Sequence, residues 1–195
     1  MDKSLADRED YWASFYSTKS RGGSLMPPSQ FAAFVAQELE PGSPIFDVGC
    51  GNGRDSIFFA EMGFKVVALD ASEEAIKFVQ GKARERGLEN IKLILSDING
   101  PKLRETLDQI AHAKACIYAR FFLHAINESE QGTFLQTLSN SLRPGNRLAF
   151  EYRTIEDQFL EKEALPHFRR YQSAKNLNKQ LQNLGFNKTY AIEGQ

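Results

Sequence analysis

The stretch that decides the fold is PIFDVGCGNG, residues 44–53. Its first five residues form a short apolar run interrupted by one acid, and glycines follow at alternate positions. An apolar run of this length is typical of a strand that is covered on both faces. Gly49 permits a tight turn, and Gly51 and Gly53 let the backbone approach a ligand because they carry no Cβ atom. The stretch therefore predicts a strand followed by a ligand-binding turn.

Similar runs recur along the chain and alternate with helical patterns. They predict further strands at residues 65–70, 91–97, 114–120 and 147–153, with a weaker candidate at 187–192. Apolar stripes with helical spacing, several of them preceded by a capping serine, predict helices that start at Ser29, Ser72, Ser129 and Ser173. Such an alternation predicts an α/β fold with a doubly wound, mostly parallel sheet flanked by helices. Ligands of that architecture bind beyond the carboxyl ends of the strands.

Two classes of cofactor use a glycine loop of this kind. A dinucleotide site favours G-x-G-x-x-G, which from Gly49 would require glycine or alanine where Arg54 stands. An S-adenosylmethionine site favours an acid followed by three alternate glycines, and Asp47 with its glycines matches that pattern in full. Asp70 ends the next strand, at the interval expected for an acid that accepts from ribose hydroxyls. The spacing therefore favours S-adenosylmethionine, and a tight turn without a ligand is the alternative.

The segments IFDVGCGNGRDSIFFAEMG (45–63) and KVVALDAS (65–72) resemble the class I S-adenosylmethionine-dependent methyltransferases. The resemblance covers roughly residues 29–192 and implies a Rossmann-like methyltransferase fold that closes with an antiparallel strand. It implies that the acid of the glycine loop lies near the cationic end of the cofactor, that Asp70 binds the ribose and that Asp97 reads the adenine amino group. The cofactor-binding residues expected on this basis are Asp47, Gly49, Cys50, Gly51, Gly53, Asp70, Ala71, Asp97, Ile98 and Tyr16.

The end of the chain departs from the resembling family. The family usually closes with a hairpin of two strands, whereas this chain stops at Gln195, just after the sixth strand candidate. We therefore expect that the last strand is missing, either because the chain is truncated or because the strand is lost. An edge strand would then be unpaired, and another chain could cover it.

Two stretches outside the sheet pattern are candidates for the substrate side. Residues 1–28 contain YWASFY (11–16), which is either a helix packed on the core or a lid that brings Tyr16 to the cofactor. Residues 154–172 form an insert whose basic and aromatic residues could bind an anionic acceptor, because arginine binds carboxylate or phosphate with two hydrogen bonds. The alternative is a solvated loop. The candidate substrate-binding residues are Tyr152, Arg153, His167, Arg169 and Arg170.

The candidate catalytic residues follow the fourth predicted strand, in ARFFLHAI (119–126). The resembling fold places the methyl group beside this segment. His124 is the best-placed general base because neutral imidazole can accept a proton near neutral pH, whereas Arg120 beside it stays charged. A histidine among apolar residues is also commonly a packed core residue, so both interpretations stand. YARFFLHAI and HFRRY more weakly resemble methyltransferase modules of bacterial surface-glycan enzymes, which implies a sugar or phosphate oxygen as acceptor.

Composition excludes several other classes. The 195 residues suit one domain, and 24 Lys and Arg against 25 Asp and Glu argue against a mainly electrostatic nucleic-acid binder. Cys50 and Cys116 lie in apolar stretches, which is typical of a reduced, cytoplasmic protein. We find neither metal-ligand spacing nor an apolar run long enough to span a membrane.

The prediction is a single methyltransferase domain over residues 1–195, which uses S-adenosylmethionine to methylate an oxygen of a small-molecule or glycan acceptor. Two other functions stay open. One is a nonenzymatic S-adenosylmethionine-binding or scaffold domain. The other is an NAD(P)-dependent oxidoreductase, which Arg54 disfavours.

Overall fold

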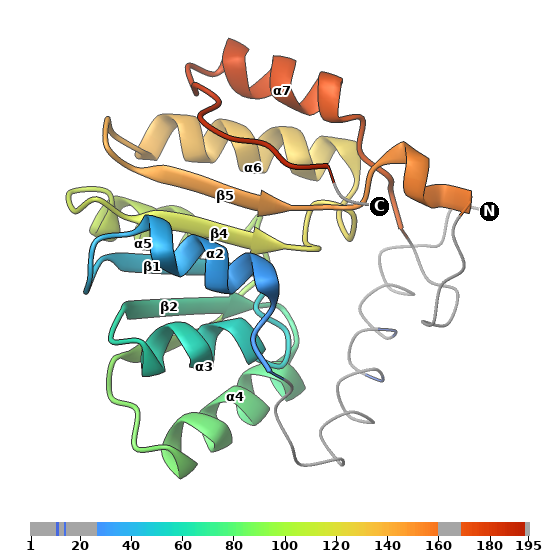
Figure 1. Cartoon of the computed structure of the whole chain (residues 1–195). Helices are drawn as coiled ribbons and strands as arrows, with labels where there is room; N and C mark the ends of the chain where they lie inside the picture. Colours follow the sequence, from blue (N-terminus) through green and yellow to red (C-terminus); the bar gives the residue numbers. More distant parts are fainter. Residues whose placement is uncertain (1–10, 12–13, 15–26, 160–168, 194–195) are drawn as a thin grey trace.

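The computed structural model describes residues 11, 14, 27–159 and 169–193 (Figure 1). Strands and helices alternate along these residues, as the sequence predicts. The strands are β1 (Pro44–Val48), β2 (Lys65–Asp70), β3 (Ile91–Leu95), β4 (Cys116–Arg120) and β5 (Arg147–Glu151). The helices are α2 (Gln30–Glu38), α3 (Arg54–Glu61), α4 (Glu73–Glu85), α5 (Pro101–Ile110), α6 (Glu128–Ser141) and α7 (Ala174–Asn183), and a 3-10 helix covers Ile155–Phe159.

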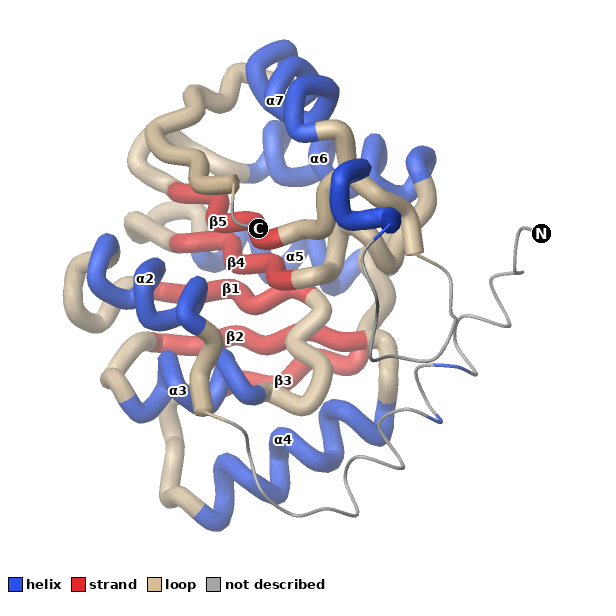
Figure 2. Tube along the Cα trace, turned by 45° about the vertical axis from the view of Figure 1, so that its right-hand side comes forward, coloured by secondary structure: helices blue, strands red, loops and turns tan. Residues whose placement is uncertain are grey.

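The five strands form one parallel sheet in the order β3-β2-β1-β4-β5 (Figure 2). Residues of α2 and α3 pack with one face of the sheet, around Phe59 and Tyr118. Residues of α5, α6 and α7 pack with the other face, around Phe46 and Phe134. The predicted doubly wound sheet is therefore confirmed. The strand order reverses between β1 and β4, which is where a fold of this kind binds its ligand.

Most helices begin where the sequence predicts. The hydroxyl oxygens of Ser29, Ser72 and Ser173 each accept a hydrogen bond from a backbone N–H of the first turn. The helix predicted from Ser129 instead begins at Glu128, because Asn127 caps it through a reciprocal pair of hydrogen bonds with Glu130.

The predicted strands are correct in place but three are too long. The strand predicted for 91–97 ends at Leu95, that for 114–120 starts at Cys116, and that for 147–153 ends at Glu151. The extra residues lie at the strand ends, where the chain turns toward the next element.

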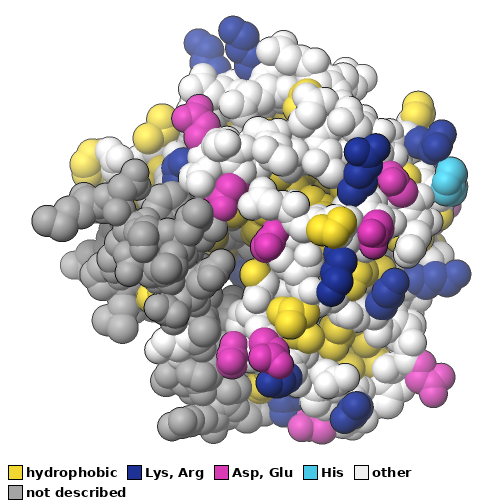
Figure 3. Space-filling view, turned by 180° about the vertical axis from the view of Figure 1, so that it is seen from behind, with side chains coloured by type: hydrophobic (Ala, Val, Ile, Leu, Met, Phe, Trp, Pro, Cys, Tyr) yellow, Lys and Arg dark blue, Asp and Glu magenta, His cyan; other side chains and the backbone are white. Residues whose placement is uncertain are grey.

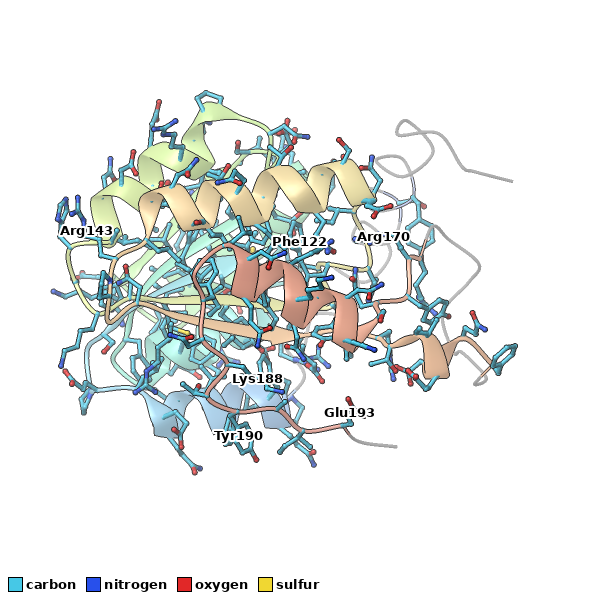
Figure 4. The ribbon with its side chains drawn as sticks, turned by 90° about the horizontal axis from the view of Figure 1, so that it is seen from above. Phe122, Arg143, Arg170, Lys188, Tyr190 and Glu193 are labelled. Carbon is cyan, nitrogen blue, oxygen red and sulfur yellow. The ribbon has the colours of Figure 1, made fainter. Side chains whose placement is uncertain are left out.

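The weak strand candidate at 187–192 is wrong: these residues form neither strand nor helix. Figure 4 shows Lys188 and Tyr190 on a segment that passes over α2. The ring of Tyr190 stacks on that of Phe34 in α2, with centroids 5.1 Å apart. This contact holds the segment by its side chain, and within the described residues no strand pairs with the outer edge of β5.

A buried carboxylate joins three elements on the α2 side of the sheet. Both carboxylate oxygens of Asp55, in α3, accept hydrogen bonds. Oδ1 accepts from the backbone N–H of Ser29 at 2.9 Å. Oδ2 accepts from the hydroxyl of Ser29 at 2.9 Å and from the hydroxyl of Tyr118, in β4, at 2.8 Å. Arg54 Nε lies 3.2 Å from Oδ1. Because Ser29 also caps α2, this one carboxylate fixes α2 and α3 to the sheet.

The first prediction concerns the stability that this carboxylate provides. Asp55→Ala should lower the free energy of unfolding by about 3–5 kcal/mol, the scale found when one partner of a buried charged network is removed. Urea unfolding of the wild type and the variant measures the difference. Glu61→Ala, which removes a surface partner of Arg86, is the matched control and should change the midpoint little. Equal midpoints for Asp55→Ala and the wild type would contradict this role.

The stability that Asp55 provides depends on pH, and its direction follows from the pKa of the carboxyl group. Burial acts to raise the pKa of Asp55, but the hydrogen bonds from Ser29 and Tyr118 and the nearby Arg54 outweigh it, so the pKa lies below its ordinary value. The stabilisation is therefore complete above the pKa of the unfolded chain and is lost as the pH falls through the folded pKa. Asp55→Ala should lack this acid-sensitive component.

Candidate active site

The glycine loop between β1 and α3 is attached to the end of β2. Gly49, Gly51 and Gly53 all have positive φ, at 72°, 57° and 69°, which favours glycine at each position. The backbone N–H groups of Gly49 and Cys50 donate to the carbonyl of Leu69, at 2.8 and 3.0 Å. The loop therefore takes its shape from its glycines and its position from the neighbouring strand.

Two of these glycines are also required by packing. A Cβ atom on Gly49 would lie 2.6 Å from Cδ2 of Phe122, which follows β4. A Cβ atom on Gly53 would overlap the side chain of Val79 in α4. Gly53 leaves room for α4 to pack closely, and its contact with a ligand stays a prediction.

Asp70 lies at the carboxyl end of β2 and holds the loop in place. Its Oδ2 accepts from the backbone N–H of Gly51 and its Oδ1 from that of Ser72, both at 2.8 Å. Burial raises its pKa, and these N–H groups act in the opposite direction. The backbone N–H of Ala71 acts on the pKa in the same direction. An ionised carboxylate can accept about four hydrogen bonds, so Asp70 retains capacity for a further donor while it keeps the loop in shape.

Asp47 is the second acid of the site and is almost completely buried, with an exposed fraction of 3%. The hydroxyl of Ser56, in α3, donates to its Oδ2 at 2.5 Å. Burial raises the pKa of Asp47 to about 7; the carboxylates of Asp55 and Asp70 add to this, and the Ser56 hydrogen bond opposes it. The site therefore contains an acid whose charge has little support from the protein itself.

The other predicted cofactor residues lie around these two acids. Cys50 is partly buried within the glycine loop, and Ala71 is exposed directly after β2. Asp97 is exposed two residues after β3, and its Oδ1 accepts from the backbone N–H of Asn99 at 2.7 Å. Ile98 is buried and belongs to the core. All four follow neighbouring strands at the same edge of the sheet. Tyr16 lies outside the described residues.

The loop between β4 and α6 begins with Phe121, which has a positive φ of 54°. This conformation is uncommon and unfavourable for a bulky residue, and it is found mainly where the surroundings enforce it. Its N–H donates to the carbonyl of Glu151 at 2.8 Å, and the guanidinium carbons of Arg120 and Arg153 lie 4.1 and 5.0 Å from its ring centroid. Arg120 also forms an ion pair with Glu151. Arg120 is thus tied to β5, next to the predicted catalytic segment.

His124 lies in the same loop and is buried, with an exposed fraction of 6%. Its ring centroid is 5.6 Å from that of Phe121. Phe122, two residues before His124, contacts the glycine loop at Gly49. The structure therefore brings the segment that carries His124 against the predicted cofactor loop.

The predicted anion-binding cluster is only partly supported. The side chain of Arg170 donates to the backbone carbonyls of Leu123 and Ile126, at 3.4 and 3.0 Å, and to the side-chain oxygen of Gln131. These contacts engage its guanidinium within the protein, and an acceptor contact of Arg170 stays a prediction. Arg169 and Tyr152 are partly buried, and His167 lies outside the described residues.

Some residues that build the site gave no signal in the sequence. Ser56 and Val79 are ordinary helix positions, yet one binds Asp47 and the other fills the space beside Gly53. Gln131 and Gln172 are polar but almost completely buried, at 2% and 3% exposed, and they bind each other across the fold. Their partners are far away in sequence, so no local pattern could have identified them.

Several other kinds of site find no support in the described part of the chain. No group of three His, Cys, Asp or Glu residues there could hold a metal ion. No helix among those residues is both long and apolar enough to cross a bilayer. On the face in Figure 3, acidic and basic side chains are interspersed, unlike the basic stripe of a nucleic-acid binder.

Comparisons with known proteins identify the family of the chain. The family described as "Methyltransferase domain" matches residues 39–190. The probable S-adenosyl-L-methionine-dependent methyltransferase TehB of Haemophilus influenzae is 30% identical over 103 residues, which cover 53% of this chain and 33% of the relative. The ubiquinone biosynthesis O-methyltransferase of Caulobacter vibrioides is 32% identical over 111 residues, covering 53% of this chain and 38% of the relative. The chain thus matches between a third and two-fifths of the length of these two relatives.

Among solved structures, a SAM-dependent methyltransferase from Aquifex aeolicus has the same fold, with a TM-score of 0.60 and 24% identity over 79% of this chain and 78% of the other. The family match spans the strands, the glycine loop and the loop after β4. The chain belongs to the class I S-adenosylmethionine-dependent methyltransferases.

Proposed function

We propose that this chain transfers a methyl group from S-adenosylmethionine to an oxygen atom of a small-molecule or glycan acceptor. The strongest support is Asp70, whose carboxylate holds the glycine loop through Gly51 and Ser72 and retains capacity for a further donor. A ribose hydroxyl is such a donor.

Asp47 supports the same cofactor. S-adenosylmethionine carries a positive amino group and a positive sulfonium, and a buried acid with one side-chain hydrogen bond can stabilise such charges. A nicotinamide dinucleotide instead brings a pyrophosphate, whose negative charge would lie near two acids. The charge of the site therefore favours a cationic cofactor.

When bound, S-adenosylmethionine supplies an activated methyl group and a neutral leaving group. The protein has to align the acceptor with the methyl–sulfur bond and exclude water. The loop between β4 and α6 is suited to this, because Phe122 packs on the glycine loop and His124 is buried in the same turn. We propose that His124 takes the proton of a hydroxyl acceptor and that Arg120, tied to Glu151, holds the start of the loop.

The choice of oxygen rests on His124 and on one relative, whose name describes an O-methyltransferase. A hydroxyl acceptor loses a proton as its oxygen attacks carbon, so it benefits from a base. The proposed acceptor contacts are Tyr152 and Arg153, directly after β5, and Arg169.

The second prediction tests the cofactor. S-adenosylhomocysteine should raise the melting temperature of the protein and NAD should not, because at 100 times its dissociation constant a ligand adds about 2.7 kcal/mol of stability. Asp70→Ala should weaken S-adenosylhomocysteine binding by about a hundredfold, the scale of one or two lost hydrogen bonds to a charged group. Calorimetry measures the dissociation constant of S-adenosylhomocysteine for the wild type and for Asp70→Ala.

Asp108→Ala is the matched control, because Asp108 pairs with Arg104 on the exposed side of α5 and should leave cofactor binding unchanged. A thermal shift with NAD alone would rule out the proposed function. Wild-type affinity in a folded Asp70→Ala variant would remove Asp70 from the site.

The third prediction concerns the charge of Asp47. Because its pKa is about 7, most of it is ionised at pH 8 and about a tenth at pH 6. If the ionised form binds the positive amino group, which S-adenosylhomocysteine shares with S-adenosylmethionine, the affinity for S-adenosylhomocysteine should fall by up to about tenfold from pH 8 to pH 6. Asp47→Asn should bind weakly at both values. An unchanged pH dependence in Asp47→Asn would contradict the assignment.

The same substitution has an opposite effect on stability. The folded pKa of Asp47 is raised, so ionisation destabilises the ligand-free protein as the pH rises toward and through 7. Asp47→Asn should therefore raise the melting temperature of the ligand-free protein at pH 8 by a few degrees, since each kcal/mol corresponds to about 2–4 °C in a domain of this size. A lower melting temperature of Asp47→Asn at pH 8 would show that the ligand-free protein stabilises the ionised form of Asp47.

The fourth prediction concerns His124. His124→Gln should lower turnover by at least about tenfold, because a positioned general base contributes about 10²–10⁴-fold, with cofactor affinity nearly unchanged. Turnover is measured with a catechol, a methyl hexoside and a hexose phosphate as acceptors. His112→Gln, on the exposed loop before β4, is the control. Normal turnover with a lowered melting temperature would make His124 a packing residue.

A further inference from the structure

The loop between β4 and α6 has buried carbonyl groups that its own elements do not satisfy. Leu123, His124 and Ile126 are 0%, 6% and 5% exposed. Buried carbonyls need partners, and an unsatisfied one costs about as much as a lost hydrogen bond. For this loop the partners come from the end of the insert, more than forty residues further on.

Arg170 is the principal partner. Its backbone N–H donates to the carbonyl of His124 at 2.9 Å, and its Nε donates to the carbonyl of Ile126 at 3.0 Å. The carbonyl of Leu123 accepts from Arg170 Nη2 at 3.4 Å and from Gln172 Nε2 at 3.0 Å. One arginine therefore bonds to carbonyls on both sides of His124 and to the carbonyl of His124 itself.

The arginine is held in turn by two helices. Gln131 of α6 accepts from both Arg170 and Gln172 through its Oε1, and its Nε2 donates to Gln180 of α7 at 2.9 Å. Figure 4 shows Arg170 at the end of α6, close to the loop that contains Phe122. A planar guanidinium can satisfy several fixed acceptors at once, whereas a lysine ammonium cannot reproduce that geometry.

The other end of the loop is held by the same part of the chain. Phe121 donates to the carbonyl of Glu151, and its ring lies against Arg153. The carbonyl of Arg153 accepts from the N–H of Gln172 at 2.9 Å, next to the bridge between Thr154 and Gln172. The start and the end of the insert are thus joined, and both bind the loop that carries His124.

We propose that Arg170 is a positioning residue, which holds the β4–α6 loop against the ends of the insert and so sets the position of His124 for the acceptor. The proposal rests on the proposed function, because it concerns the acceptor side of that site. It differs from a general structural role in its location: the cofactor acids Asp47 and Asp70 lie on β1 and β2 and have no hydrogen bond to this network.

The test compares Arg170→Met, Arg170→Lys and Arg143→Met in the full chain. Arg143 is an exposed arginine at the other end of the sheet and is the matched control (Figure 4). For each protein, calorimetry gives the S-adenosylhomocysteine dissociation constant, and NMR gives the ring proton resonance of His124 at pH 8. Turnover number and KM are measured with the same catechol, methyl hexoside and hexose phosphate.

For Arg170→Met we expect a shifted His124 resonance and a kcat/KM lowered about tenfold or more, the scale of a lost charge-assisted hydrogen bond, with cofactor affinity within about threefold of the wild type. Arg170→Lys keeps the charge and the backbone N–H bond, so it should fold even if Arg170→Met does not and should give an intermediate loss. Arg143→Met should match the wild type in every measurement.

An unmoved His124 resonance in both Arg170 variants would overturn the proposal, as would kinetic losses that a weaker cofactor affinity fully explains. Failure of the proposed function has a different signature. In that case the wild type would turn over no acceptor or would not bind S-adenosylhomocysteine, while the resonance of His124 would still report whether Arg170 positions it.

Discussion

The carboxylate of Asp70 is the contact on which the rest of the site depends. A loop of alternate glycines has little conformational preference of its own, because each glycine has access to many backbone conformations. Asp70 selects one of these conformations by accepting from Gly51 within the loop and from Ser72 at the start of α4. The end of β2, the glycine loop and α4 are therefore fixed together before a ligand binds, which reduces the ordering that binding would otherwise require.

Two buried acids near this loop, Asp55 and Asp47, differ in how many hydrogen bonds the protein gives them. Asp55 receives hydrogen bonds or an ion pair at every acceptor site, and its pKa is lowered. Asp47 receives one from the Ser56 side chain, and its pKa is raised to about 7. An acid that the fold satisfies completely stabilises the fold, whereas an acid left short of donors is costly until a ligand supplies charge. The contrast separates Asp55, which stabilises the fold, from Asp47, the acid proposed to bind the cofactor.

The sequence predicted the parts of this structure that local patterns control. Apolar runs placed all five strands of the sheet, and serines before apolar stripes placed three of the helix starts. The failures have one cause, which is contact between distant residues. Residues 187–192 have the apolar pattern of a strand, but Tyr190 stacks on Phe34 and the segment does not pair with β5. At Gly53 the sequence gives no sign that a side chain of α4 lies where a Cβ atom would be.

Arg170 shows why charge alone cannot assign a substrate contact. Neighbouring arginines in HFRRY look equally able to bind an anion, since sequence gives no information on what lies in front of each guanidinium. A buried loop whose carbonyls lack partners can bind a guanidinium in place of an anionic ligand, because both offer several oxygen acceptors to a planar set of donors. The network of Arg170, Gln131 and Gln172 therefore converts a residue of the insert into part of the acceptor-side framework. If the proposed function is correct, recognition of the acceptor requires side chains that this network leaves available, and we propose Arg153, whose side chain is 49% exposed, as one of them.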